Sequence, residues 1–252
     1  MREKRSQSQR TEALSHQTES KAEFLAQSDI FRHLNPEEIN ELDRITTMIT
    51  CSPGRVFYRP GETGTIFFLL RTGHVQLYHL STDGRKLITA TLESGACFGE
   101  MPLIGQQTHH SFAEAIDDSH VYVMNRHDID NLLLRKPDVT LALLKVVGQR
   151  VVQLETQLIN ATFKGTQARL ATLLLQLARP HSLEKGRKVL VVEGLSHEEL
   201  ADRLGVYRET VSTALRELKD AGAIELGRKY ITISEPSQLE DVASSGGKGG
   251  RI

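Results

Sequence analysis

Short apolar runs separated by glycine-containing turns fill the chain between residues 50 and 125. Residues with β-branched or aromatic side chains are frequent in these runs, which recur at spacings of roughly ten residues. The runs are 56–58, 66–70, 75–78, 87–91 and 121–124. Short strands with turn signals at this spacing predict a β-sandwich or jelly roll.

Helical periods lie on both sides of this β-rich region. Two short helices are predicted over 24–31 and 36–47, and the second has Pro36 at its first position behind Asn35, a good capping residue. From Pro137 to about Phe163 apolar residues recur at spacings of three and four. This seam consists of Leu144, Val147, Val151, Leu154, Leu158 and Ala161.

The seam fits two arrangements. It can belong to one amphipathic helix packed on its own sheet, or to a parallel contact between two copies of the chain, which we favour. Leu143, Val146 and Val152 add apolar surface beside the seam. Gly165 follows, before a further helix predicted over 166–178, so the chain can bend there between two domains.

Two short helical patterns meet at one glycine near the C-terminus. Ser196 can cap the first, Glu199 completes a capping box, and Gly205 stands where a left-handed residue is expected. The second pattern buries Val211, Ala214, Leu215 and Leu218, and its outward-facing residues are Tyr207, Arg208, Glu209, Ser212 and Thr213. This pattern predicts a helix-turn-helix that reads DNA in the major groove, rather than a solvated helical hairpin.

Residues 223–233 alternate around Gly227-Arg228, which predicts a hairpin with a type II′ turn. A hairpin directly after a recognition helix is the wing of a winged helix. At its tip, Arg228 and Lys229 would contact phosphates, which positions the domain without reading sequence.

With these motifs the chain resembles the CRP/FNR family of bacterial transcription regulators, over roughly Ser28 to Val242. The most specific matches are the Arg208-Glu209-Thr210-Val211 run and Phe98-Gly99-Glu100. The resemblance implies an α+β chain with a cyclic-nucleotide-binding-type β-roll, a long dimerisation helix and a C-terminal winged helix-turn-helix. The expected parts are a disordered tail over 1–21, an effector-sensing roll over 22–135, the dimerisation helix and hinge over 136–164, the winged helix over 165–235 and a flexible tail over 236–252.

Composition and charge agree with a sensor joined to a DNA-binding domain. The 252 residues are 39% apolar and 25% charged, and the net charge is −1. Residues 164–233 hold 12 Lys and Arg against 9 Asp and Glu, whereas residues 36–135 hold 8 against 13. No apolar run is long enough for a membrane helix, and the polar N-terminus is not a secretory signal. Two cysteines fit a reducing cytoplasm and cannot supply the four thiolates of an iron–sulfur cluster.

The effector pocket matches its cyclic-AMP-binding relatives only in part. The resemblance places Gly99 and Glu100 at the ribose and His110-Ser111 where those relatives have an Arg-Ser pair for the cyclic phosphate. Neutral imidazole is a poor substitute for guanidinium. Leu154 and Glu155 occupy the positions of a Thr-Ser pair that bonds adenine, and leucine cannot hydrogen-bond a base. We therefore expect an effector other than cyclic AMP, or none; no cofactor is identified.

Several alternatives stay open at this point. The protein could respond to a cyclic nucleotide, or it could sense haem, a metal or redox state through His109, His110, Cys51 or Cys97. Surface histidines and inert buried thiols are the simpler interpretation of these residues. An enzyme would need clustered ligands, for which the candidates are His74, His79, His109, His110 and Glu114. These lack His-x-His spacing, so catalysis is not expected, and exposed Arg208-Glu209 disfavours a pure scaffold.

The expected partners are double-stranded DNA, a second copy of the chain, RNA polymerase and an unidentified small effector, with no membrane. By resemblance, Arg208 and Glu209 read a G and the cytosine of a C·G pair in each half of a palindrome. Thr213 stands where the family has a second arginine. The half-site is therefore expected to be related to TGTGA, with altered preference at one base.

Overall fold

The computed structural model describes residues 19–105, 107–182 and 188–245. The chain forms two compact units: the first joins residues up to Leu77 with Thr91–Gln149, and the second joins Tyr78–Ala90 with residues from Arg150 onward. This division differs from the predicted boundaries, which kept 22–135 in one domain. The outer part of one hairpin groups with the second unit because it contacts the helix-turn-helix there.

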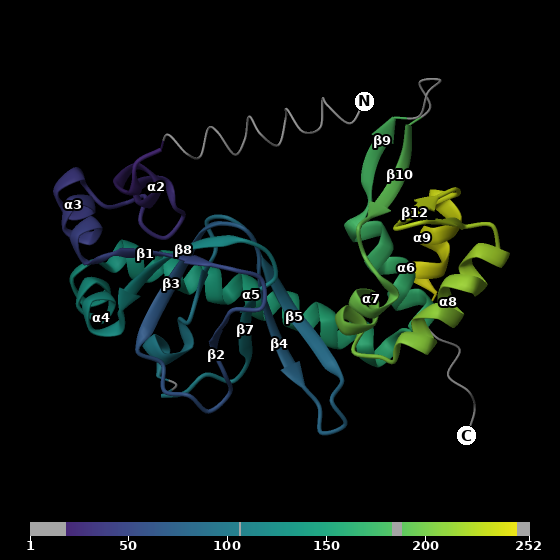
Figure 1. Ribbon diagram of the computed structural model, residues 1–252, viewed down its shortest axis with the longest axis horizontal. Coiled ribbons are helices and arrows are strands. Elements are labelled where there is room, and N and C mark those ends of the chain that lie inside the picture. The colour runs from purple at the N-terminus through teal and green to yellow at the C-terminus, as the bar shows by residue number, and fades with distance from the viewer. Residues whose placement is uncertain (1–18, 106, 183–187, 246–252) are drawn as a thin grey trace. The chain divides into compact units, whose positions relative to one another are not determined.

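Two four-stranded sheets form the roll, as the jelly-roll prediction requires (Figure 1). One sheet has the order β1-β8-β3-β6 and the other the order β2-β7-β4-β5. The strands are β1 (Thr47–Cys51), β2 (Val56–Tyr58), β3 (Ile66–Thr72), β4 (Val75–Leu80), β5 (Lys86–Leu92), β6 (Cys97–Phe98), β7 (Phe112–Ala115) and β8 (Ser119–Asn125). In the central pair β3 and β8, Leu69 lies opposite Tyr122, and both side chains are fully buried.

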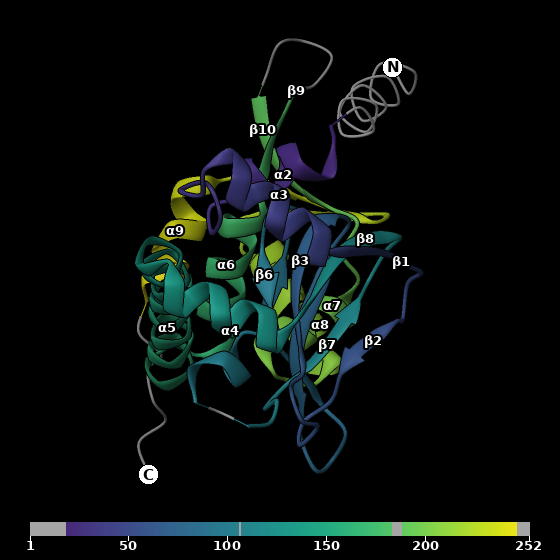
Figure 2. The ribbon, with the colours of Figure 1, turned by 90° about the vertical axis from the view of Figure 1, so that its left-hand side faces the viewer.

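Helices cover this roll. They are α2 (Lys21–Gln27), α3 (Pro36–Ile45), the short 3₁₀ helix η1 (Met101–Ile104) and α4 (Arg126–Arg135), with α2 and α3 side by side (Figure 2). The Asn35 side chain accepts a hydrogen bond from the Glu38 backbone N–H, which confirms the predicted cap of α3. Helix α5 (Pro137–Phe163) has the predicted bounds. Its first turns bury Val139 and Leu143 in the core of the roll.

The second unit holds the sheet β11-β12-β10-β9 and its helices. These elements are α6 (Thr166–Leu177), β9 (Arg179–Ser182), β10 (Lys188–Glu193), α7 (His197–Leu204), α8 (Arg208–Asp220), β11 (Ile224–Gly227), β12 (Tyr230–Ile233) and α9 (Pro236–Ser244). The buried side chains of α6, α7 and α8 form one apolar core, centred on Leu170, Leu200 and Leu215.

The prediction of a flexible tail over 236–252 was wrong for its first part. Residues Pro236–Ser244 form α9, which packs against α6 and buries Leu239 and Ala243. The apolar residues recur at helical spacing over too few turns to stand out in the sequence. The predicted N-terminal tail ends where Ser20 caps α2, and residues 1–18 and 246–252 lie outside the described part of the chain.

Candidate nucleic-acid interface and effector pocket

The helix-turn-helix is set by local capping at both ends of α7. The Ser196 hydroxyl accepts from the Glu199 N–H at 3.1 Å, and the Glu199 carboxylate accepts from the Ser196 N–H at 2.7 Å. At the other end Gly205 adopts φ 64°, which favours glycine. These contacts confirm the predicted capping box and turn. They orient α7 so that Leu200, Ala201 and Leu204 face the core.

The recognition helix α8 separates a buried face from an exposed one. Val211, Ala214, Leu215 and Leu218 are buried, as predicted. Four of the predicted DNA-contacting residues are exposed at or near its start: Tyr207, Arg208, Glu209 and Thr213. An arginine here can bond guanine O6 and N7 together, and a glutamate can accept from cytosine N4. The exposed face of α8 therefore carries the chemistry that reads base edges.

Ser212 differs from the other members of the predicted reader set. It is half-buried, and its hydroxyl donates to the Arg208 carbonyl at 3.0 Å. The same oxygen lies 2.9 Å from Nδ1 of His197, the first residue of α7. A hydroxyl has one proton, so it accepts from Nδ1–H while it donates to the carbonyl. Ser212 thus joins the two helices, and His197 is a residue of this interface that the sequence analysis missed.

The Thr213 hydroxyl is already hydrogen-bonded within α8, so the group that this residue can offer to DNA is its methyl group. Its Oγ1 lies 3.0 Å from the carbonyl oxygen of Glu209 in the same helix. The exposed methyl group can contact a thymine methyl, which is an apolar and weak form of base recognition. The altered base preference that was expected at Thr213 stays a prediction.

The wing turns one residue later than predicted. Gly227 pairs with Tyr230, so the two turn residues are Arg228 and Lys229, and Lys229 has φ 66°. The prediction of a type II′ turn with Gly227 first was wrong. A Cβ at 227 would lie 2.1 Å from the ring of exposed Tyr230, so a side chain there would displace that ring. Both Arg228 and Lys229 are exposed at the tip, where phosphate contact was predicted.

In the roll, the Phe98-Gly99-Glu100 segment is tightly constrained. Gly99 has φ 77°, and a Cβ there would lie 2.8 Å from the Ile66 carbonyl oxygen. Glu100 is only 1% exposed. A buried carboxylate needs partners, so its position is fixed by its surroundings. The segment is thus held as a fixed part of the roll.

The two adjacent histidines have opposite environments. His109 is buried and stacks on Tyr58, with ring centroids 3.6 Å apart. Burial lowers the pKa of His109, which favours neutral imidazole. His110, at the arginine position, is exposed, and Ser111 is half-buried. The residue that enters the interior is therefore His109, and it is poorly suited to supply the positive charge that a cyclic phosphate needs.

The remaining predicted residues lie on α5. Leu154 and Glu155, the expected base-contact positions, are exposed on the part of α5 that belongs to the second unit. Along the predicted seam, Leu144 is 64% exposed and Leu158 is 68% exposed. Val151 is also exposed, and Val147 is half-buried. Leu143 does not extend this surface, because it is buried in the core of the roll.

The alternative sensing chemistries find little support in the described residues. Across 19–105, 107–182 and 188–245, no three His, Cys, Asp or Glu side chains are grouped to hold a metal ion. His74 is instead paired with Asp117, with Nδ1 2.5 Å from Oδ2. Cys51 and Cys97 are buried, and burial raises the pKa of the Cys51 thiol, which disfavours the reactive thiolate. Within the same described ranges, no helix is long and apolar enough to cross a membrane.

Comparison with known proteins agrees with this geometry. Residues 48–136 match a cyclic nucleotide-binding domain, and residues 168–242 match a Crp-like helix-turn-helix domain. The chain is 27% identical over 217 residues to the CRP-like cAMP-activated global transcriptional regulator of Mycobacterium tuberculosis, covering 86% of this chain and 97% of the relative. It is 29% identical over 216 residues to the Cyclic AMP receptor protein of Thermus thermophilus, with the same coverage of both chains, 86% and 97%.

A solved structure gives the same result. A CRP/FNR-family transcriptional regulator from Thermus thermophilus aligns with a TM-score of 0.65 and 26% identity, covering 80% of this chain and 100% of that chain. The similar proteins are transcription regulators and not enzymes, which confirms the prediction that this chain is not an enzyme.

Proposed function

Because this chain belongs to the CRP/FNR family of transcription regulators, we propose that it acts as a homodimer on a palindromic operator. The observation that carries the proposal is the exposed start of α8, where Arg208 and Glu209 stand free of the core. Two such helices related by two-fold symmetry match two half-sites about one helical turn apart.

The unpaired apolar seam of α5 supports the homodimer. Leu144, Val151, Leu154 and Leu158 are all at least 41% exposed. Apolar side chains repeated at heptad spacing on a long helix are stabilised when a second helix covers them. We propose that a second copy of α5 covers this seam, because the same second chain also supplies the second recognition helix.

For the effector, we propose a ligand other than cyclic AMP, or operator binding without any effector. Exposed His110 replaces the expected arginine, and buried His109 is held in its neutral form. Leu154 cannot hydrogen-bond a base. A cyclic-nucleotide-responsive regulator is the second candidate, favoured by the buried Glu100 after Gly99 and by two relatives whose names refer to cyclic AMP.

Recruitment of RNA polymerase and action in the cytoplasm belong to the same proposal. A regulator that binds an operator works where the chromosome is transcribed, and a dimer seated there can contact the polymerase. Operator DNA is not found in the membrane or outside the cell, so the exposed face of α8 would have no DNA to bind there.

Selection of DNA ligands from a random pool by the purified full chain tests the proposal. The expected result is one enriched palindrome with half-sites about 10 base pairs apart between centres. Enrichment of no motif, at a salt concentration that still allows nonspecific binding, would overturn it.

A further inference from the structure

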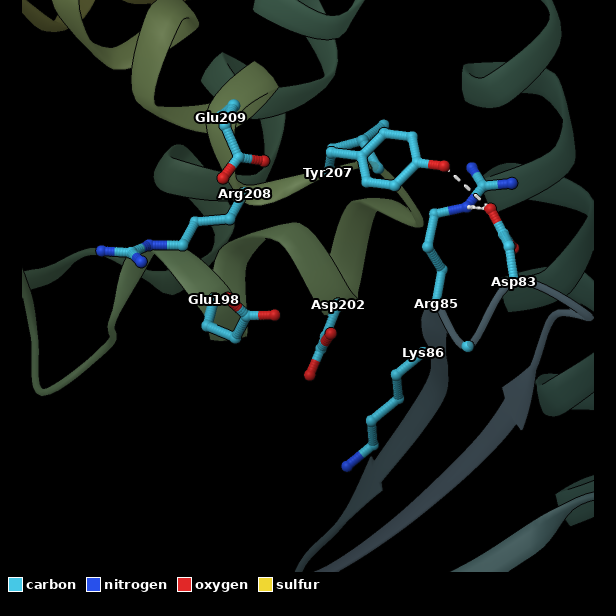
Figure 3. Close-up of a pocket in the computed structure, with 10 residues that line it drawn as sticks. Asp83, Arg85, Lys86, Glu198, Asp202, Tyr207, Arg208 and Glu209 are labelled. Atoms are coloured by element: carbon cyan, nitrogen blue, oxygen red, sulfur yellow. Dashed lines mark hydrogen bonds and ion pairs between the residues drawn. The ribbon is translucent and has the colours of Figure 1, made fainter.

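The hairpin between β4 and β5 contacts the start of the recognition helix within the second unit (Figure 3). The Tyr207 hydroxyl donates to Asp83 Oδ2 at 2.8 Å, and Arg85 Nε donates to the same oxygen at 2.9 Å. The Arg85 guanidinium carbon lies 5.0 Å from the centroid of the Tyr207 ring. The hairpin thus contacts both the hydroxyl and the ring of Tyr207, the residue that directly precedes α8.

Further contacts bring the hairpin against α7 and the turn. Leu87 lies so close to Gly205 that a Cβ at 205 would be 3.0 Å from its Cδ1. Lys86 is near enough to Asp202 to oppose the effect of burial, which raises the pKa of the Asp202 carboxyl. The contact therefore involves both helices of the helix-turn-helix and the turn between them.

The position of Asp83 matters for DNA binding because it is anionic. Hydrogen bonds from Ser81, Tyr207 and Arg85 hold the pKa of its carboxyl well below the usual range, so it is a carboxylate at neutral pH. The start of a helix attracts anions, and a recognition helix approaches DNA through its first turn. Arg85 is ion-paired with this carboxylate, so the competition concerns the tyrosine proton: Tyr207 cannot donate to Asp83 and to a phosphate at the same time.

Tyr207 has no capping bond of its own to α8, so its side chain is available to either partner. In Figure 3 its ring points to Asp83 and Arg85, whereas the Arg208 side chain extends away from the hairpin. The contact therefore leaves Arg208, the proposed base reader, uncovered. It engages the neighbouring Tyr207, which would lie near the phosphate backbone.

We propose that the Asp83–Tyr207 contact is an autoinhibitory latch, in which the hairpin carboxylate occupies the site of a DNA phosphate at the start of α8. Operator binding then requires the hairpin to release Tyr207. Strands β4 and β5 belong to a sheet of the roll, so a change in the roll has a direct covalent route to the latch. This inference rests on the proposed operator binding through α8.

A double-mutant cycle on operator affinity tests the latch with the full-length chain. Asp83→Ala is expected to tighten binding by about threefold to tenfold, because it frees the Tyr207 hydroxyl for a phosphate. Tyr207→Phe breaks the same hydrogen bond but also removes that donor, so it is not expected to tighten binding. Tyr207→Phe keeps the ring against Arg85 and removes only the hydroxyl. In the Tyr207→Phe background, Asp83→Ala is expected to change affinity no further.

The double-mutant cycle distinguishes loss of the Asp83–Tyr207 contact from the general effect of removing one negative charge. If Asp83→Ala tightens binding equally in both backgrounds, or weakens it, the latch is overturned. Glu93→Ala, which removes an exposed acid elsewhere on the roll, measures the general charge effect and is expected to leave affinity nearly unchanged. Asp83→Asn keeps the turn geometry if alanine disturbs it. Failure of the wild-type chain to bind its selected palindrome would instead contradict the proposed function itself.

Discussion

His197 Nδ1 lies 2.9 Å from Ser212 Oγ, and this hydrogen bond joins the first residue of α7 to the recognition helix. It adds a polar contact between two helices whose buried faces share one apolar core. The same serine oxygen also contacts the carbonyl of Arg208, the residue proposed to read a base.

Ser212→Ala is expected to lower the free energy of unfolding by about 0.5–1.5 kcal/mol, because the partly buried imidazole loses its partner. Thr213→Ala is the matched control, since its hydroxyl contacts only its own helix. Both changes gain similar helix propensity. Denaturant unfolding should therefore find Ser212→Ala less stable than Thr213→Ala; equal stabilities would show that the interhelical bond contributes nothing.

Arg208→Ala is expected to cost about 1–3 kcal/mol in operator binding and to relax preference at one base of each half-site. The reason is loss of a bidentate contact to guanine from an exposed side chain at the start of α8. Binding-site selection with both proteins measures the effect. Equal stringency at every position would mean that Arg208 does not read bases.

Lys229→Ala is expected to weaken binding to all sequences similarly and to reduce the slope of log affinity against log salt by about one unit per subunit. Lys229 is exposed at the wing tip, where it can neutralise a phosphate. Affinity measured across a salt series on selected and random DNA gives the result. A change confined to the selected sequence would contradict a phosphate role.

Val151→Glu together with Leu154→Glu is expected to produce monomers that bind the operator poorly. The two carboxylates would be brought next to their counterparts in a parallel α5 pair, where burial and repulsion disfavour them. Lys145→Glu, an exposed change outside the seam, is the control. Analytical ultracentrifugation decides: a double variant that is still dimeric would exclude this interface.

Cyclic AMP is expected to bind weakly at neutral pH and not to be required for operator binding. The physical reason is the exposed imidazole of His110 in place of a guanidinium, beside a His109 that burial keeps neutral. Isothermal titration calorimetry provides the measurement. Binding at micromolar affinity or tighter, about −8 kcal/mol or more favourable, would restore the cyclic-nucleotide alternative.

The features that the sequence predicted best depend on interactions within a few residues. The Asn35 and Ser196 caps, the left-handed Gly205 and the bounds of α5 were all predicted and are all present. Each follows from a hydrogen bond or a steric preference over at most four residues, or from a long unbroken period.

Elements with weak local signals were missed or misplaced. Strands β6 and β7 are short, and their pairing partners come from distant segments of the chain. The wing turn lies one residue later than predicted because Gly227 pairs with Tyr230, and this cross-strand register is not visible in the local sequence. Helix α9 forms because α6 offers Leu239 an apolar surface.

Neighbouring residues were sufficient to predict a two-part DNA-binding regulator, because helix caps, turns and apolar periods depend on residues that are close in sequence. Three features became visible only in the folded chain: His109 is buried whereas His110 is exposed, His197 bonds Ser212, and Asp83 bonds Tyr207 across 124 positions of chain. Such contacts depend on how distant segments approach one another, and no local pattern encodes that approach.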